Sequence, residues 1–373
     1  MNLTNLTCNR EGLLTACSAA GAIANNRSPK AIVRNLLLNP TAKTVSATDL
    51  EIGLVYRVSG ISEASGEPVC IPAAELLSIL RELDDETISI ESTQGGIRIS
   101  GLTSEFELQT SRADEFPEIK TEIKKVSSIK AADLVQIARR VSFAASNENS
   151  RYALATVALD LAQRDKAIGV ATDGRRCAVM PAPSSINAES SQISRVSLFS
   201  PKSLALLGKL LIDPDEHVEF EFTSDNAIFR TAKISFWCRL VEGKYPRYED
   251  VMPAKPNHKV DLPVGRFCTL LRQSKILTSE QTKGVSFEFF KGTLTLRSTD
   301  ERGKSKVTMP VEFDADLVIT LDPQMVLDGM RVLDTDSSVT LELVDGKRAA
   351  LFRQPGGAGD FRFVVMPLTK ERG

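Results

Sequence analysis

The residues best suited to chemistry in this chain lie in a short motif that combines a carboxylate with arginines. In ATDGRRCAVMP, residues 171–181, Asp173 precedes a glycine and two adjacent arginines. A reactive Asp173 would do acid–base chemistry, whereas a structural one would only help to reverse the chain. Asp-Gly after a β-rich run favours a type I′ turn, in which both central residues have positive φ. Because the Thr-Asp pair recurs at Asp49 and Asp300, we expect Asp173 to be a turn residue of a repeated scaffold.

The sequence carries no other recognisable catalytic or metal-binding motif. Its two histidines, His217 and His258, have no metal-ligand or triad partner nearby, and the HExxH, P-loop, GxGxxG and GxSxG patterns are absent. We therefore expect no catalytic residue, no metal and no cofactor. Carboxylates far apart in the sequence could still meet in space, so the residues alone leave open a hydrolase or transferase on a repeated α+β scaffold.

Composition and charge favour a cytoplasmic globular protein. Of the 373 residues, 42% are hydrophobic and 25% charged, which is ordinary for a soluble chain. No apolar stretch approaches the roughly 18 residues of a membrane span, and the N-terminus lacks the pattern of a signal peptide. Six scattered cysteines without a CxxC pair indicate reduced thiols rather than a zinc site or a disulfide framework. The net charge of −2 means that any DNA contact must come from charge segregation within the fold.

Three markers repeat along the chain at intervals of about 125 residues. The first is the Thr-Asp pair, and the second is a proline that opens a leucine-rich helical pattern, at Pro72, Pro201 and Pro323. Proline suits the first helical turn, and Ser200 and Asp322 stand where an N-cap would be. The third marker closes each unit: Phe116-Pro117, Tyr245-Pro246 and Val365-Met366-Pro367. We therefore predict three homologous domains, at residues 1–126, 127–254 and 255–373.

Each predicted domain follows one plan. A helical segment leads, at residues 7–20, 130–145 and 263–277, and short alternating strands follow it. The proline-started helix comes next, and then an alternating stretch with a Gly, Asp or Asn turn that indicates a hairpin. The predicted class is therefore α+β, with two helices packed on antiparallel sheets in each domain.

Basic residues are mildly enriched in some of the helical segments. Residues 130–151, 200–212 and 263–279 each carry a small excess of lysine and arginine, and Arg27, Lys30 and Arg34 follow the first helix. Ordinary solvated helix faces would explain this bias equally well.

Five motifs, taken in order, resemble those of the bacterial DNA sliding clamp, the β subunit of the DNA polymerase III holoenzyme. They are ATDLEIGL, RYALATVALD, ATDGRRCAV, GKYPRYEDVMP and the closing FVVMPL, and the resemblance runs through essentially the whole chain. It implies a non-enzymatic processivity factor with the DNA-clamp fold, whose head-to-tail homodimer closes a ring around double-stranded DNA. The implied partners are the DNA polymerase III core, an ATP-dependent clamp loader and other clamp-binding replication and repair proteins, without membrane contact.

The resemblance also assigns residues to three surfaces of such a ring, the first two being the dimer interface and the DNA-facing wall. Residues matching the family's dimer interface are Phe106 and Leu108 in one domain and Ile276 and Leu277 in another; without the resemblance, these apolar residues would be assigned to the internal core. The residues expected to face DNA without sequence readout are Arg27, which matches a loop arginine of the family, and Arg139, Arg140, Lys202, Arg266 and Arg272.

The third implied surface is a hydrophobic groove between domains II and III that binds client peptides. Residues matching it are Leu154, Thr172, Gly174, Arg176, Cys177, Pro246, Val251, Met325, Val364, Val365, Met366, Pro367 and Leu368. An apolar floor with an adaptable methionine and a few polar groups suits an extended peptide. A peptide-binding scaffold without DNA remains an alternative, given the near-neutral charge.

Several residues depart from the family pattern. Cys177 stands where leucine is common, Arg175 where histidine is frequent, Asp250 at a usually basic position and Thr282 at an aromatic one. The chain also continues beyond the usual end, from Thr369 to Gly373. Because of these departures, the sequence does not define which client peptides are preferred. It also does not define the stability of the dimer or the way in which the ring opens.

Overall fold

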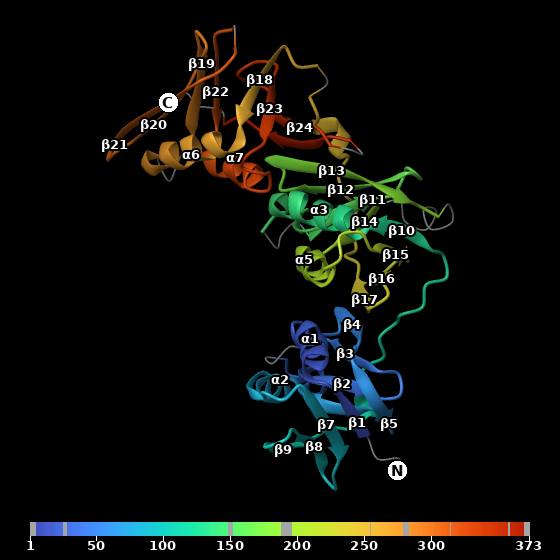
Figure 1. The fold of residues 1–373 in the computed structure, drawn as a ribbon. Coiled ribbons are helices and arrows are strands. Elements are labelled where there is room, and N and C mark those ends of the chain that lie inside the picture. Colours follow the sequence, from blue (N-terminus) through green and yellow to red (C-terminus); the bar gives the residue numbers. More distant parts are fainter. Residues whose placement is uncertain are drawn as a thin grey trace. The chain divides into compact units, whose positions relative to one another are not determined.

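The computed structural model describes residues 5–24, 28–147, 152–187, 196–253, 255–278, 283–313, 315–356 and 359–368 (Figure 1). These residues group into two compact units. One comprises Met1–Ala131 with Leu206–Leu240, and the other Ala132–Ala205 with Val241–Gly373. Arg27 and Thr282, and the extension from Thr369 to Gly373, lie outside the described residues.

The first unit contains two runs of antiparallel strands. One run is ordered β5 (Ile61–Ser65), β1 (Asn5–Asn9), β7 (Thr87–Ser92), β8 (Gly96–Ser100) and β9 (Glu105–Gln109). The other is ordered β6 (Val69–Pro72), β2 (Asn35–Asn39), β3 (Thr44–Thr48), β4 (Ile52–Arg57), β17 (Ile234–Arg239), β16 (Asn226–Arg230), β15 (His217–Phe222) and β10 (Ser127–Lys130). Helices α1 (Arg10–Gly21) and α2 (Ala73–Glu82) lie side by side, and α1 packs on β3 and β4 (Figure 1).

The second unit repeats this design. Its longer run is ordered β14 (Val196–Phe199), β11 (Val157–Asp160), β12 (Lys166–Thr172), β13 (Arg176–Ser185), β25 (Phe361–Val365), β24 (Ala350–Gln354), β23 (Ser338–Leu343) and β18 (His258–Pro263). Its shorter run is β21 (Gly303–Pro310), β20 (Thr293–Asp300), β19 (Val285–Phe290) and β22 (Leu317–Leu321). Helix α6 (Val264–Ser274) lies beside α7 (Pro323–Met330) (Figure 1), so the predicted pairing of helices with antiparallel sheets is confirmed.

The remaining helical segments are two α-helices and six short 3-10 helices within the described residues. Helix α3 (Ala131–Val141) packs closely on β12, since a Cβ added at Gly169 would come within 2.2 Å of Ile137. Helix α5 (Pro201–Leu210) follows β14. The 3-10 helices are η1 (Ala31–Arg34), η2 (Ala113–Glu115), η3 (Ser142–Ala144), η4 (Tyr152–Ala155), η5 (Tyr248–Val251) and η6 (Lys275–Leu277). None of the helices in these described ranges is long and apolar enough to cross a membrane.

The leading helices are shorter than the sequence predicts. The helix expected at residues 7–20 begins only at Arg10, because residues 5–9 form β1 with Leu6 and Cys8 buried in strict alternation. The segments 130–145 and 263–277 end as the 3-10 helices η3 and η6. Tight 3-10 turns are common where an α-helix ends.

The predicted caps and hairpins are largely confirmed. The Asp322 carboxylate accepts a hydrogen bond from the Gln324 N–H at 2.8 Å, and the Ser200 hydroxyl accepts one from the Ser203 N–H at 3.1 Å. Pro72 is the N-cap of α2 rather than a first-turn residue. The three alternating stretches form the hairpins β7–β8, β15–β16 and β23–β24.

Candidate functional site

The carboxylate of Asp173 is committed to holding a turn. It accepts hydrogen bonds from the N–H groups of Arg175 at 2.8 Å and Arg176 at 3.0 Å. The Thr172 hydroxyl donates to the Arg176 carbonyl at 2.6 Å and accepts from the Gly174 N–H at 3.1 Å. The predicted type I′ geometry is wrong, because only Gly174, at φ 89°, has positive φ in this turn. The turn is instead fixed by side-chain bonds to the backbone.

The same bonds recur in the other copies of the motif. Asp49 accepts from the N–H groups of Glu51 and Ile52, and Asp300 accepts from those of Arg302 and Gly303, all at 2.7–3.0 Å. The structural role predicted for the repeated Thr-Asp pair is therefore confirmed.

Arg176 ties this turn to two distant segments. Its Nε donates to Asp173 Oδ2 at 3.0 Å, its Nη1 to Asp328 Oδ2 of α7 at 2.8 Å, and its Nη2 to the Phe143 carbonyl at 2.8 Å. The guanidinium also lies 5.5 Å from the centre of the Phe143 ring. With only 11% of its side chain exposed, Arg176 is a largely buried cation, paired with two carboxylates, beside the cavity described next.

A cavity of about 620 Å³ opens beside the turn. Four segments form its walls: η4, the end of the β12–β13 hairpin, the stretch 244–251, and the end of β25 with the residue after it. The volume and the mostly apolar lining suit an organic or peptide ligand. The lining residues are Ala153, Leu154, Thr172, Gly174, Arg175, Arg176, Cys177, Lys244, Tyr245, Pro246, Arg247, Tyr248, Val251, Val364 and Met366.

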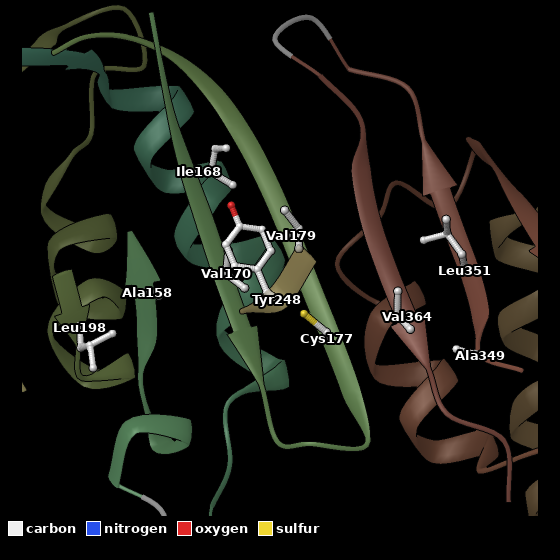
Figure 2. Packing of buried hydrophobic residues seen from close by; sticks show 10 residues of the cluster. All are labelled: Ala158, Ile168, Val170, Cys177, Val179, Leu198, Tyr248, Ala349, Leu351 and Val364. Atoms are coloured by element: carbon white, nitrogen blue, oxygen red, sulfur yellow. The ribbon is translucent and has the colours of Figure 1, made fainter. Parts of the chain in front are cut away.

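The cavity floor belongs to a larger buried apolar cluster (Figure 2). Cys177 of β13 and Val364 of β25 are paired in the strand register and are almost completely buried. Tyr248 packs in the same cluster as Val170, and its hydroxyl donates to Asp160 at 3.2 Å. The Tyr245 hydroxyl donates to the Val170 carbonyl at 3.4 Å. Strand pairing and two tyrosine hydrogen bonds thus position the residues of the cavity floor.

Cys177 should resist chemical modification in the folded protein. Burial raises the pKa of its thiol to about 12, so at pH 8 almost none of it is the reactive thiolate. We expect iodoacetamide at pH 8 to alkylate Cys177 completely in urea-unfolded protein and negligibly in native protein over the same time. Mass spectrometry of the Cys177 peptide measures the extent of labelling. Rapid labelling of the native protein would show that the cavity floor opens.

Nine of the thirteen residues expected in the peptide groove line this cavity. The other four are Met325, Val365, Pro367 and Leu368. Val365 is buried in β25, and the Leu368 N–H donates to the Thr320 carbonyl at 2.9 Å. Sequence reasoning missed Ala153, Arg175, Lys244, Tyr245, Arg247 and Tyr248. The motif GKYPRYEDVMP contains most of these, and its two tyrosines beside a proline were the available signal.

The residues expected to face DNA occupy three helices. Arg139 is exposed on α3, Lys202 on α5, and Arg266 and Arg272 on α6. Arg140 differs, because its guanidinium lies 5.6 Å from the centre of the Phe361 ring. Burial and the neighbouring Arg139 lower the pKa of Arg140 from its usual value. Within the described ranges, no group of three or more His, Cys, Asp or Glu could hold a metal ion.

The residues expected at a dimer interface lie on or near sheet edges. Phe106 and Leu108 belong to β9, which ends its run of strands. Ile276 and Leu277 belong to η6, which packs against β20 and β21, and β21 ends the shorter run of the second unit. Phe106 is 37% and Ile276 66% exposed, so both side chains are accessible in a single chain.

Three family models match the chain in order. They describe the N-terminal, central and C-terminal domains of the DNA polymerase III beta subunit, and they match residues 4–120, 128–247 and 249–369. The beta sliding clamp of Pseudomonas putida is 27% identical over 371 residues, covering 98% of this chain and 99% of the relative. That of Escherichia coli K12 is 25% identical and covers 97% and 99%.

Solved structures give the same answer. The crystal structure of a sliding clamp from Pseudomonas aeruginosa, bound to griselimycin, superposes with a TM-score of 0.91 at 25% identity, covering 98% of this chain and 99% of that one. The beta subunit from Thermotoga maritima shares the fold with a TM-score of 0.86 at 22% identity, covering 99% and 100%. The chain therefore belongs to the family of DNA polymerase III beta subunits, the bacterial sliding clamps.

Proposed function

We propose that this protein is the processivity factor of the replicative DNA polymerase: a homodimeric ring that encloses duplex DNA and tethers client proteins through the apolar cavity. The observation that carries this proposal is the match to all three domains of the beta subunit in order, over nearly the whole chain. A ring that works by enclosure needs no active site, so we assign it no catalytic residue and no cofactor. Its place of action would be the bacterial cytoplasm, where the chromosome is replicated.

Ring closure would join the two free strand edges. Pairing β9 of one copy with β21 of the other would continue the sheet and cover edges that otherwise invite aggregation. The charges of the edges are complementary: β9 carries Glu105 and Glu107, which share Arg98 as their ion-pair partner, and β21 carries Lys304 and Lys306. Phe106, Leu108, Ile276 and Leu277 would supply the apolar contacts. The domains we propose remain residues 1–126, 127–254 and 255–373.

The dimer interface can be tested with one substitution. We expect wild-type protein to have about twice the chain mass of 40.7 kDa. Ile276→Asp should weaken the dimer at least tenfold, because a carboxylate would be buried without a partner. Sedimentation over a concentration series measures this change. Ile212→Asp is the matched control, since Ile212 is also exposed but lies outside the proposed interface. Equal dissociation of both variants would argue against this interface.

Topological binding has a direct test. We expect protein loaded on nicked circular DNA, by a clamp loader with ATP, to stay bound through gel filtration and to be lost when a restriction enzyme linearises the DNA. Phosphate contacts carry no sequence information, so every position along the DNA is equivalent and the ring can slide. The residues proposed to make these contacts are Arg27, Arg139, Arg140, Lys202, Arg266 and Arg272. Retention on linear DNA with free ends would overturn enclosure and favour ordinary DNA binding.

The cavity would capture short client segments of the polymerase III core and of other replication and repair proteins. Burial of two or three apolar anchors contributes about 1.5–3 kcal/mol of binding free energy each, and ordering the peptide opposes part of it. The expected dissociation constant is therefore roughly micromolar. Tethering makes each rebinding intramolecular, at an effective concentration of about a millimolar. Modest affinity therefore allows clients to exchange without losing processivity.

A further inference from the structure

Among the described residues that line the cavity there is no aspartate or glutamate, whereas four are cations. These are Arg175, Arg176, Lys244 and Arg247; the other lining residues are apolar or uncharged at neutral pH. An apolar cavity with a rim of one charge sign attracts ligands of the opposite sign. The strength of that attraction depends on how many of these cations already have a partner.

Two of the four cations are compensated. Arg176 is paired with both Asp173 and Asp328. Arg247 lies 3.6 Å from Asp250, a carboxylate within one turn of η5. Arg175 and Lys244, by contrast, are exposed and form no ion pair with any residue in the described ranges. The rim therefore presents two uncompensated positive charges.

These two cations lie on different walls of the cavity. Arg175 lies in the β12–β13 turn, and its carbonyl accepts the Met366 N–H at 2.8 Å. Lys244 immediately precedes Tyr245, whose ring lines the cavity and whose hydroxyl is hydrogen-bonded. An extended segment that places an apolar side chain in the cavity must carry its flanking residues across this rim. A nucleic acid backbone would match the cations but leave the apolar cavity empty.

We propose that the groove selects client segments in which the apolar anchor is flanked by aspartate or glutamate, with Arg175 and Lys244 as the specificity-determining residues. This inference rests on the proposed client-binding function. Exposed ion pairs are individually weak, so two of them give a preference of about three- to tenfold at low salt. Screening reduces that preference as the ionic strength rises.

The test compares capped peptides that differ only at the flanking positions. One is Gly-Asp-Asp-Leu-Leu-Asp-Asp-Gly, the second has Asn in place of each Asp, and a third has Ser in place of both Leu. Fluorescence anisotropy gives their dissociation constants at about 50 mM and about 500 mM NaCl. We expect the acidic peptide to bind about three- to tenfold tighter than the Asn peptide at low salt, nearly equally at high salt, and the Ser peptide not at all.

Substitutions assign this preference to its residues. The double variant Arg175→Gln/Lys244→Gln should bind the acidic and the Asn peptide equally tightly at low salt. Arg164→Gln is the matched control: Arg164 is exposed, without an ion pair in the described ranges, and precedes β12 at the end opposite the cavity. Equal binding of the two leucine peptides to wild-type protein, or a preference that survives the double variant, would overturn the inference alone. If neither leucine peptide bound, the proposed client-binding function itself would be contradicted.

Discussion

Replacing Arg176 by methionine is expected to lower the free energy of unfolding by about 3 kcal/mol. The substitution keeps much of the side-chain volume but removes three charge-assisted hydrogen bonds, to Asp173, Asp328 and the Phe143 carbonyl. The two carboxylates would remain partly buried without their cation, and an unpaired buried charge costs more than the pair contributes. Because Arg176 also lines the cavity, peptide affinity should fall as well.

The measurement is urea denaturation, with hydrogen exchange of β13 and α7 to locate the loss. Arg302→Met provides a matched control within the same chain. Arg302 follows the Asp of the third Thr-Asp copy and bonds Asp300 in a similar way, but 68% of its side chain is exposed. Exposed ion pairs contribute little, so this variant should unfold close to the wild-type midpoint. A similar loss in both variants would show that the turn, rather than the buried network, stabilises the fold.

Replacing Gly329 by alanine is expected to lower the free energy of unfolding by about 2 kcal/mol, although alanine has the better helix propensity. A Cβ at this position of α7 would come within 2.2 Å of Cε1 and 2.4 Å of Cδ1 of Phe363. Phe363 is completely buried and packs edge-on against Phe143, with the ring centres 5.2 Å apart. Its ring cannot move aside without shifting β25, so the neighbouring Val364 on the cavity floor should shift too.

Thermal unfolding and peptide affinity together report this change. The control is Gly95→Ala, because a Cβ there has no neighbour within 4 Å and Gly95 does not have positive φ. The melting temperature of that variant should be unchanged or slightly raised, since alanine reduces the conformational entropy of the unfolded chain. If Gly329→Ala kept the wild-type melting temperature and affinity, the contact between α7 and Phe363 would have to be looser than the structure shows.

The sequence by itself determined the features that depend on nearby residues. Alternation of apolar residues predicted the hairpins, the spacing of the Thr-Asp and proline markers predicted the repetition, and Asp322 was expected as a cap before Pro323. These signals are legible because turns, caps and strand faces are set by residues a few positions apart. The same local logic failed at residues 7–9, where pairing of β1 with β5 and β7 overrides a helical pattern.

The tertiary structure alone decided how the cavity is assembled and charged. Arg176 and Asp328 are 152 positions apart, and Val364 meets Cys177 only through the pairing of β25 with β13. No local pattern encodes such contacts, since they arise when distant strands and helices pack together. The same holds for the rim: whether an arginine is neutralised, like Arg176, or left uncompensated, like Arg175, depends on which carboxylates the fold brings within reach.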